Sequence, residues 1–174
     1  MNHLTHLTAG ACLGAVLAPQ HPALWALGAI GALLPDLDSP KTTIGRLVPP
    51  VSWLINKLLG WNAPHPDGHR GGTHSLLAVV AVSLLARHAL GPTAGWVLAG
   101  GYVSHLLLDQ LTIQGIRWLW PMPLDFRLPR PLAVASGHPW ANAAVSILVV
   151  AGTLGQRFHH ELEPWAAQLA GMLF

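Results

Sequence analysis

Residues 96–112 form an almost uninterrupted apolar stretch that nevertheless contains a histidine and an aspartate, His105 and Asp109, four positions apart. A stretch this apolar predicts a helix, and a spacing of four places both side chains on the same helix face. Ionisable groups in such a helix are unfavourable unless something compensates them. Two compensations remain open at this point: the pair is hydrogen-bonded to itself within a core, or it binds a divalent metal ion.

Charged residues make up only 9% of the 174-residue chain, against 52% apolar residues, whereas soluble domains contain about a quarter charged residues. This shortage predicts a membrane protein, or a soluble helical enzyme with an unusually apolar surface. The net charge of +2 and the lack of a basic run argue against nucleic acid as a partner. The single cysteine argues against a disulfide framework or a thiolate metal cluster, whereas the eleven histidines favour a metal site.

Apolar stretches separated by proline- and glycine-rich segments predict an all-α fold, specifically a polytopic helical membrane protein with four to five apolar helices. The stretches comprise residues 7–18, 23–34, 74–90, 93–111 and 139–154. The first two are shorter than a spanning helix requires, so they form either a hairpin of short helices or a broken spanning pair. We expect one domain over residues 1–174, in which 139–174 is an apolar helix followed by an amphipathic tail.

The distribution of basic residues predicts which loops face the cytoplasm. Segments 36–72 and 114–138 contain seven of the nine lysines and arginines, and the cytoplasmic loops of membrane proteins are enriched in these residues. The same two segments contain four tryptophans, a residue that is enriched at membrane interfaces. The sequence therefore predicts a multi-pass protein in the lipid bilayer, with both segments on the cytoplasmic face.

This topology brings metal-ligand residues from four helix ends to the cytoplasmic face. These residues are His6, Asp36, Asp38, His69, His74, His105 and Asp109. Imidazole and carboxylate groups are suitable ligands for Zn²⁺, Mn²⁺ or Fe²⁺, and this set is larger than one four-coordinate ion needs. We therefore expect a divalent metal site at this membrane face, with enough ligands for two ions.

The segment from His69 to His74 has the composition of a binding site. Its two histidines flank a Gly-Gly turn that lets the backbone bring both imidazoles to one point, and Arg70 is a bidentate partner for phosphate or carboxylate. Upstream, Asp36 and Asp38 lie two positions apart, so in an extended segment one binds metal while the other orients a ligand. Both patterns also have a purely structural interpretation, as a polar loop and as turn residues that end a helix.

Several common catalytic motifs are absent from the sequence. It contains no Gly-x-Ser-x-Gly, no Walker phosphate-binding loop and no His-Glu-x-x-His. Metal-assisted hydrolysis is the enzyme class that remains, because a bound divalent ion lowers the pKa of water and polarises a phosphoryl or acyl oxygen. The roles of His65, Asp67 and His138, three polar loop residues, stay open.

Three strings match a known family in order and in spacing. They are Leu-Leu-Pro-Asp-Leu-Asp-Ser-Pro-Lys at 33–41, Gly-His-Arg-Gly-Gly-Thr-His-Ser-Leu-Leu at 68–77 and Tyr-Val-Ser-His-Leu-Leu-Leu-Asp-Gln-Leu-Thr at 102–112. Together they resemble the LexA-regulated inner-membrane family of metal-dependent hydrolases. The resemblance covers roughly residues 5–130.

The resemblance implies an all-helical protein of the bacterial inner membrane that uses a divalent metal, with Zn²⁺ or Mn²⁺ as the expected ion. The resemblance carries over seven candidate site residues: His6, Asp36, Asp38, His69, His74, His105 and Asp109. All of them except Asp38 are the expected metal ligands. Asp38 is then an orienting residue or general base, and Arg70 holds the anionic group of the substrate. The arrangement is also similar to that of zinc-dependent phospholipases C and nucleases, which favours phosphoester cleavage.

The sequence thus leads to two hypotheses. The first is a membrane-bound hydrolase that cleaves a phosphoester or other ester with a metal-activated water at the cytoplasmic membrane surface, where a lipid or lipid-linked phosphoester is the expected substrate. The second is a non-catalytic metal-binding membrane protein that serves transport, sensing or assembly. Transport is disfavoured, because the ionisable residues gather at one face and form no path across the bilayer.

Overall fold

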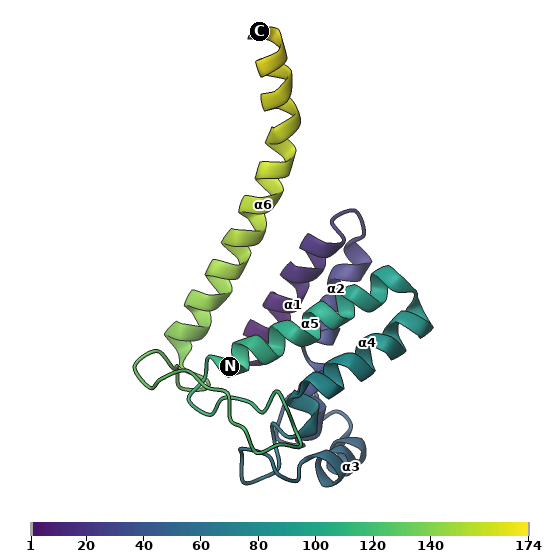
Figure 1. Cartoon of the computed structure of the whole chain (residues 1–174), viewed down its shortest axis with the longest axis vertical. Helices are drawn as coiled ribbons and strands as arrows, with labels where there is room; N and C mark the ends of the chain where they lie inside the picture. Colours follow the sequence, from purple (N-terminus) through teal and green to yellow (C-terminus); the bar gives the residue numbers. More distant parts are fainter. Residues whose placement is uncertain (1, 174) are drawn as a thin grey trace.

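The computed structural model of the protein describes residues 2–173 as an assembly of helices (Figure 1). The elements are α1 (His3–Leu17), α2 (Pro22–Gly31), η1 (Leu34–Asp38), α3 (Pro49–Leu59), η2 (Gly72–His74), α4 (Leu76–Leu90), α5 (Pro92–Gln110) and α6 (Pro139–Leu173). Within the described range, β-type pairing is limited to two isolated bridges in the segment after α5. The all-α fold class predicted from the apolar stretches is therefore confirmed.

Local sequence signals explain where these helices begin and end. Asn2 caps α1 by accepting a hydrogen bond from the backbone amide of Thr5, and Ser75 caps α4 in the same way through Ala78. Gly91, with φ of 89°, separates α4 from α5, a conformation that glycine adopts without strain. His74 consequently lies in the 3-10 turn η2, two residues before α4, and not in the first turn of an α-helix as the apolar pattern predicted.

The helix α2 packs against both α1 and α5 at backbone distance. A Cβ atom on Gly10 would lie 2.4 Å from the carbonyl oxygen of Gly28, and one on Gly101 would lie 2.0 Å from the same oxygen. Because no side chain fits in either place, only glycine permits this close approach. The close packing brings His105, one turn beyond Gly101, within hydrogen-bonding distance of Ala32 at the end of α2.

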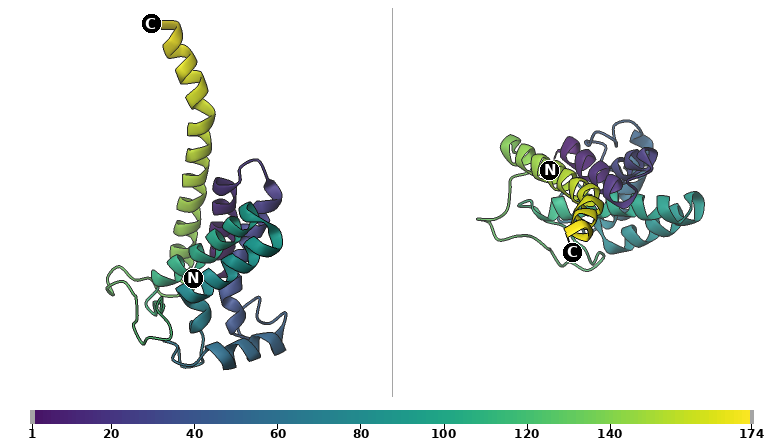
Figure 2. Two further views of the ribbon diagram at one scale, coloured as in Figure 1. Left: turned by 45° about the vertical axis from the view of Figure 1, so that its right-hand side comes forward. Right: turned by 90° about the horizontal axis from the view of Figure 1, so that it is seen from above.

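The final helix α6 is continuous from Pro139 to Leu173 and covers the segments predicted as an apolar helix and an amphipathic tail. Its first turns lie beside α1, where the Asn142 side chain accepts hydrogen bonds from the Asn2 amide (3.0 Å) and the Thr5 hydroxyl (3.2 Å). The C-terminal half extends beyond the other helices (Figure 2). The start of α6 is therefore tied to the same end of α1 that contains His6.

The predicted polytopic membrane fold is not supported. No helix within residues 2–173 combines the length and the apolar composition needed to cross a bilayer. At 15 residues each, α1 and α4 are about 22 Å long, whereas the hydrocarbon core is about 30 Å thick. The longer α5 contains polar residues in its last turns, and α6 is interrupted by polar side chains such as Asn142 and Gln156.

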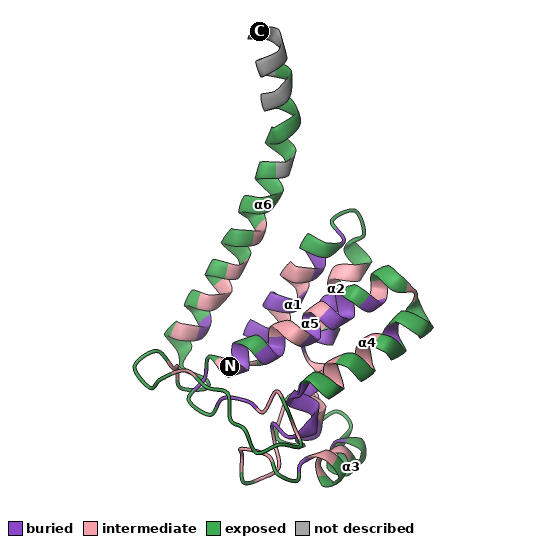
Figure 3. Ribbon diagram, in the orientation of Figure 1, coloured by how far each residue is buried: buried purple, intermediate pink, exposed green. Residues whose placement is uncertain are grey.

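Buried residues are concentrated on the facing sides of α1, α2 and α5 and at the junction of the bundle with η1 and η2 (Figure 3). At this junction Tyr102, Leu106 and Ile116 form the apolar core cluster. The hydroxyl of Tyr102 donates a hydrogen bond of 2.5 Å to the backbone oxygen of Thr73. This contact fixes the short turn η2 against α5, and it thereby sets the position of His74 next to His105.

Candidate metal centre

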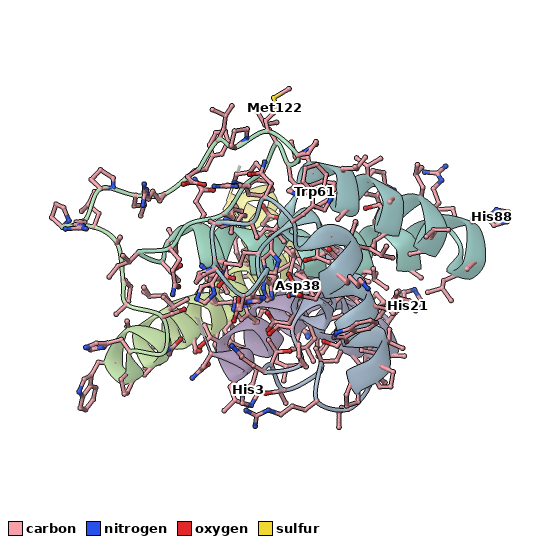
Figure 4. The ribbon with its side chains drawn as sticks, turned by 90° about the horizontal axis from the view of Figure 1, so that it is seen from below. His3, His21, Asp38, Trp61, His88 and Met122 are labelled. Carbon is pink, nitrogen blue, oxygen red and sulfur yellow. The ribbon has the colours of Figure 1, made fainter. Side chains whose placement is uncertain are left out.

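Four separate parts of the chain bring the six predicted ligands to one end of the bundle. The helix α1 contributes His6, η1 contributes Asp36, the segment through η2 contributes His69 and His74, and α5 contributes His105 and Asp109. Four of these side chains are buried, and those of Asp36 and His69 are half-buried at the edge. In the view of Figure 4, the neighbouring Asp38 lies near the centre of the molecule, whereas His88 lies at its edge.

The first group of ligand atoms consists of His6, His105 and Asp109, all buried. The rings of His6 and His105 are stacked, with centroids 3.8 Å apart. The Nε2 atom of His6 lies 3.4 Å from one Asp109 carboxylate oxygen, and the Nε2 atom of His105 lies 3.5 Å from the other. One carboxylate therefore faces two imidazoles from two different helices.

The second group consists of Asp36, His69 and His74, and it adjoins the first. The Nε2 atom of His69 lies 3.8 Å from Asp36. Two further distances connect the groups: His105 Nε2 is 3.6 Å from Asp36, and His74 Nε2 is 3.6 Å from Asp109. The two groups thus form one continuous cluster of imidazoles and carboxylates.

Three buried imidazole nitrogens in this cluster have no hydrogen-bond partner among the described residues: Nδ1 of His6, Nε2 of His74 and Nε2 of His105. Buried polar atoms are nearly always paired, so unpaired ones call for an explanation. Four ligands at about 2.1 Å from a central ion lie about 3.4 Å from one another, close to the spacings in this cluster. The donor set therefore fits a bound divalent metal ion.

Asp38 lies behind the histidines and holds two of them. Its carboxylate accepts hydrogen bonds from His69 Nδ1 at 2.6 Å, from the Arg70 amide at 3.0 Å and from the Thr73 hydroxyl at 2.7 Å. It also lies 3.4 Å from His74 Nδ1. This arrangement directs the Nε2 atom of His69 toward Asp36, as carboxylates behind metal-binding histidines do.

The charges and hydrogen bonds around Asp38 and His69 favour the ionised form of the Asp38 carboxylate. Burial by itself would raise the pKa of Asp38, but His74 and the hydrogen bond from His69 hold it well below its usual range. Burial by itself would lower the pKa of His69, but the hydrogen bond to Asp38 and the charges of Asp38 and Asp36 raise it above its usual value. Asp38 is therefore a charged hydrogen-bond acceptor. Its predicted function as a general base stays a prediction.

The Arg70 side chain is buried and is bound on two sides by protein groups. Its Nη1 donates to the Thr112 hydroxyl at 2.7 Å and to the Gly115 carbonyl at 3.1 Å, and its Nη2 lies 2.9 Å from Asp109. These contacts position Asp109 and neutralise its charge. That Arg70 also holds an anionic substrate, as the sequence suggested, stays a prediction.

A pocket of about 270 Å³ connects the cluster to the surface. Lys41, His65 and Gln114 line it together with residues of both ligand groups. The carboxylate of Asp67 accepts hydrogen bonds from Lys41 (3.0 Å) and His65 (2.6 Å). Burial works against ionisation, but Lys41, the amide of His69 and His65 together lower the pKa of Asp67 to about 2. His65 therefore belongs to the wall of the pocket, Asp67 is bonded to that wall through His65 and Lys41, and neither residue belongs to a ligand group.

Sequence reasoning missed several residues that support the site. The carbonyl of Ala32 and the side chain of Thr112 have no motif of their own, and only the folded chain brings them to His105 and Arg70. Thr73 could have been identified, since it lies between two predicted site residues and has a hydroxyl that reaches Asp38. His138, whose role was left open, belongs to neither ligand group.

Comparison with known proteins places the site within a protein family. The chain matches the YdjM inner membrane protein family over residues 1–173. Inner membrane protein YdjM of Escherichia coli K12 is 42% identical over 105 residues, which cover 56% of this chain and 48% of that protein. Protein YvsG of Bacillus subtilis 168, described as uncharacterized, is 35% identical over 107 residues, covering 60% of this chain and 61% of YvsG.

A more extended match connects the chain to inner membrane protein YbcI of Escherichia coli K12, with 31% identity over 149 residues, 79% of this chain and 77% of that protein. The chain spans about half the length of the YdjM proteins that it matches. No solved structure matches the chain.

The family match confirms the resemblance inferred from the three sequence strings, and the names of these relatives support a location in the inner membrane. The chain belongs to the YdjM inner membrane protein family.

Proposed function

We propose that this protein is a membrane-associated, metal-dependent hydrolase that cleaves a phosphoester, or another ester, at the membrane surface. One observation supports this proposal above all others. Buried imidazole nitrogens of His6, His74 and His105 have no hydrogen-bond partner among the described residues. They belong to a cluster of imidazoles and carboxylates, part of which lines a pocket that reaches the surface. A closed structural cluster would need no such pocket.

The ligand set favours Zn²⁺ or Mn²⁺. It contains imidazole nitrogens and carboxylate oxygens and no thiolate, a combination typical of both ions in hydrolases. His6, His105 and Asp109 would hold one ion, and Asp36, His69 and His74 a second. When bound, such an ion supplies a water of lowered pKa and polarises the phosphoryl or acyl oxygen.

The remaining residues prepare the site for that chemistry. Asp38 holds the Nδ1 hydrogen of His69, so that its Nε2 lone pair faces the pocket. Arg70 holds Asp109 and balances its buried charge. Lys41, at the mouth of the pocket, adds positive charge that attracts an anionic substrate. Of the two roles expected for Asp38, this proposal uses the orienting one, because its buried carboxylate lies behind His69. Arg70 and Lys41 contact the anionic group of the substrate.

The surface of the helices supports a lipid environment and a lipid or lipid-linked substrate. Large apolar side chains are exposed on α4 and α6, where a water-facing surface would be polar. They include Leu77, Leu84, Leu85, Ile147 and Leu148, each more than 60% exposed. We propose that this surface contacts the inner membrane and that the pocket, near Lys41 and Arg70, faces the cytoplasm. Alkaline carbonate extraction checks the first point: the protein is expected in the membrane pellet, and recovery in the supernatant would contradict it.

Metal binding is tested by elemental analysis of the purified protein. We expect bound Zn²⁺ or Mn²⁺ in the natural protein and a loss of it in His74→Ala and Asp109→Asn. His88→Ala is the matched control, because His88 is exposed on α4 and lies far from the cluster (Figure 4). Circular dichroism checks that each variant remains helical. Equal metal content in all four proteins would contradict the assigned ligands.

Hydrolysis is tested on protein loaded with Zn²⁺ or Mn²⁺. The probes are bis(p-nitrophenyl) phosphate in solution and phosphatidylglycerol in vesicles. We expect turnover that requires the added metal, disappears in His74→Ala and persists in His88→Ala. If the loaded protein turns over neither these probes nor a broader ester panel, the alternative is favoured, a metal-binding protein without catalysis.

A further inference from the structure

A second and larger pocket lies between α1, α5 and α6. It is mostly apolar, whereas the metal pocket is polar. It measures about 460 Å³. Apolar side chains line most of it, among them Leu13 and Val16 from α1, Leu107 from α5, and Leu148 from α6. We refer to it as the α1–α6 groove. It is long, open on one side and almost without polar surface, so an apolar chain fits it better than water or a polar ligand does.

Two hydroxyl groups that line the groove, those of Ser104 and Thr153, are already hydrogen-bonded within their own helices. The hydroxyl of Ser104 donates to the Gly101 carbonyl at 2.7 Å, and that of Thr153 donates to the Val149 carbonyl at 2.9 Å. Neither hydroxyl needs a partner from a ligand. Apart from Gln156 at the end near Val16, an occupant of the groove therefore gains mainly from apolar contact.

The groove begins where the metal pocket ends. On α1, His6 lines the metal pocket and Ala9, one helical turn later, lines the groove. On α5, Asp109 lines the metal pocket and its neighbour Leu108 lines the groove. From these residues the groove follows α1 away from the metal cluster for about 10 Å, as far as Val16. On both helices, with increasing distance from the cluster, a polar pocket with metal-ligand residues is thus followed by an apolar channel.

We propose that the α1–α6 groove holds one acyl chain of a lipid whose phosphate group occupies the metal pocket. This inference rests on the proposed function and narrows its substrate to a phosphorylated lipid with at least one long acyl chain. The match of polarity supports it, because such a lipid joins an anionic head to an apolar tail in the same order as the two pockets. The family's inner-membrane location places acyl lipids beside the protein.

The only cysteine in the sequence, Cys12, lines this groove and serves as a built-in reporter. The full chain is purified in a steroid-based detergent that has no acyl chain, and the rate of Cys12 alkylation by N-ethylmaleimide is followed by mass spectrometry. The probes are palmitoyl and octanoyl lysophosphatidic acid and, without a chain, glycerol 3-phosphate. We expect palmitoyl lysophosphatidic acid at about ten times its Kd to slow alkylation about tenfold. The octanoyl probe should protect less, and glycerol 3-phosphate should not protect.

Two glycines on α6 provide a matched pair of variants. Gly152 lines the groove and Gly155 does not, and a Cβ atom added at either position meets nothing within 4 Å. Gly152→Phe therefore places a ring in the groove without a backbone clash, whereas Gly155→Phe adds the same ring elsewhere on the same helix. We expect Gly152→Phe to abolish the protection by palmitoyl lysophosphatidic acid and Gly155→Phe to retain it.

The outcomes separate this inference from the proposed function. Protection that is absent, independent of chain length, or equal in the two glycine variants would overturn the acyl-chain site. Protection of Cys12 that rises with protein concentration in the absence of lipid would also overturn it, because a second copy of the chain would then cover the groove. Chain-dependent protection without turnover would support the acyl-chain site and contradict the hydrolase. Turnover of lipid that is unchanged by Gly152→Phe would support the hydrolase and contradict the acyl-chain site.

Discussion

The ring of His105 donates its Nδ1 hydrogen to the backbone carbonyl of Ala32, 2.6 Å away and 73 residues earlier in the chain. Because a carbonyl oxygen only accepts hydrogen bonds, this contact places a hydrogen on Nδ1 and leaves Nε2 facing Asp36 and Asp109. In the neutral ring, that Nε2 atom offers its lone pair to a metal ion. The end of α2 thus orients a histidine of α5. Backbone carbonyls often hold metal-binding histidines in this way.

Replacing Asp38 by asparagine should weaken metal binding without unfolding the protein. The amide keeps the shape of the side chain but loses the negative charge that accepts hydrogen bonds from His69, Arg70 and Thr73. Loss of such an orienting carboxylate typically weakens metal binding about 10- to 100-fold. Isothermal titration with Zn²⁺ or Mn²⁺ measures the change. Asp125→Asn, which alters only an exposed ion pair with Arg117, should bind as the natural protein does.

Replacing Arg70 by methionine should destabilise the metal-free protein. The change leaves the buried carboxylate of Asp109 without its cationic partner, and breaking a buried pair in this way costs about 3–5 kcal/mol. A bound divalent ion should restore part of that stability, because it supplies positive charge to the same carboxylate. Urea unfolding with and without metal measures both effects. Arg130→Met, in an exposed loop, is the control, and a similar loss in that variant would argue against the role of Arg70.

The metal-free protein should lose stability as the pH rises above about 6.5, the pKa of an unfolded histidine. The folded pKa of His69 is raised by its contacts with Asp38 and Asp36. Its contribution is therefore fully present below the unfolded value, about 6.5, and is lost as the pH rises through the folded pKa. Thermal unfolding of chelator-treated protein across this range checks the prediction. His69→Gln should make the stability depend less on pH. An unchanged pH dependence in that variant would mean that another titratable group causes it.

Replacing Asn142 by leucine should loosen the start of α6. The Asn142 side chain accepts hydrogen bonds from Asn2 and Thr5 and donates one to His138. The substitution leaves buried polar groups unpaired, at a cost of about 1–3 kcal/mol. Hydrogen exchange should increase in the first turns of α6, and urea unfolding should show the loss of stability. Thr153→Val, whose hydroxyl bonds only within α6, should change either measurement little.

Much of the fold and of the site could be predicted because it depends on local spacing. Apolar stretches and their proline or glycine ends placed most of the helices, and a step of four residues placed His105 and Asp109 on one face of α5. The predicted membrane-spanning bundle was not supported. The prediction inferred long helices from the low content of charged residues, and the two properties are independent. The structure instead uses Gly28 and Gly101 to pack short helices at backbone distance.

The sequence by itself determined which elements form and which side chains with metal-ligand chemistry they contain, since both follow from residue type and periodicity along the chain. Only the tertiary structure decided which nitrogen of His105 faces the cluster, that Arg70 holds Asp109, and that an apolar groove continues from the metal pocket along α1. These features depend on contacts between residues far apart in sequence. The spacing of residues specifies which face a side chain occupies, and the packing of distant segments specifies what that face meets.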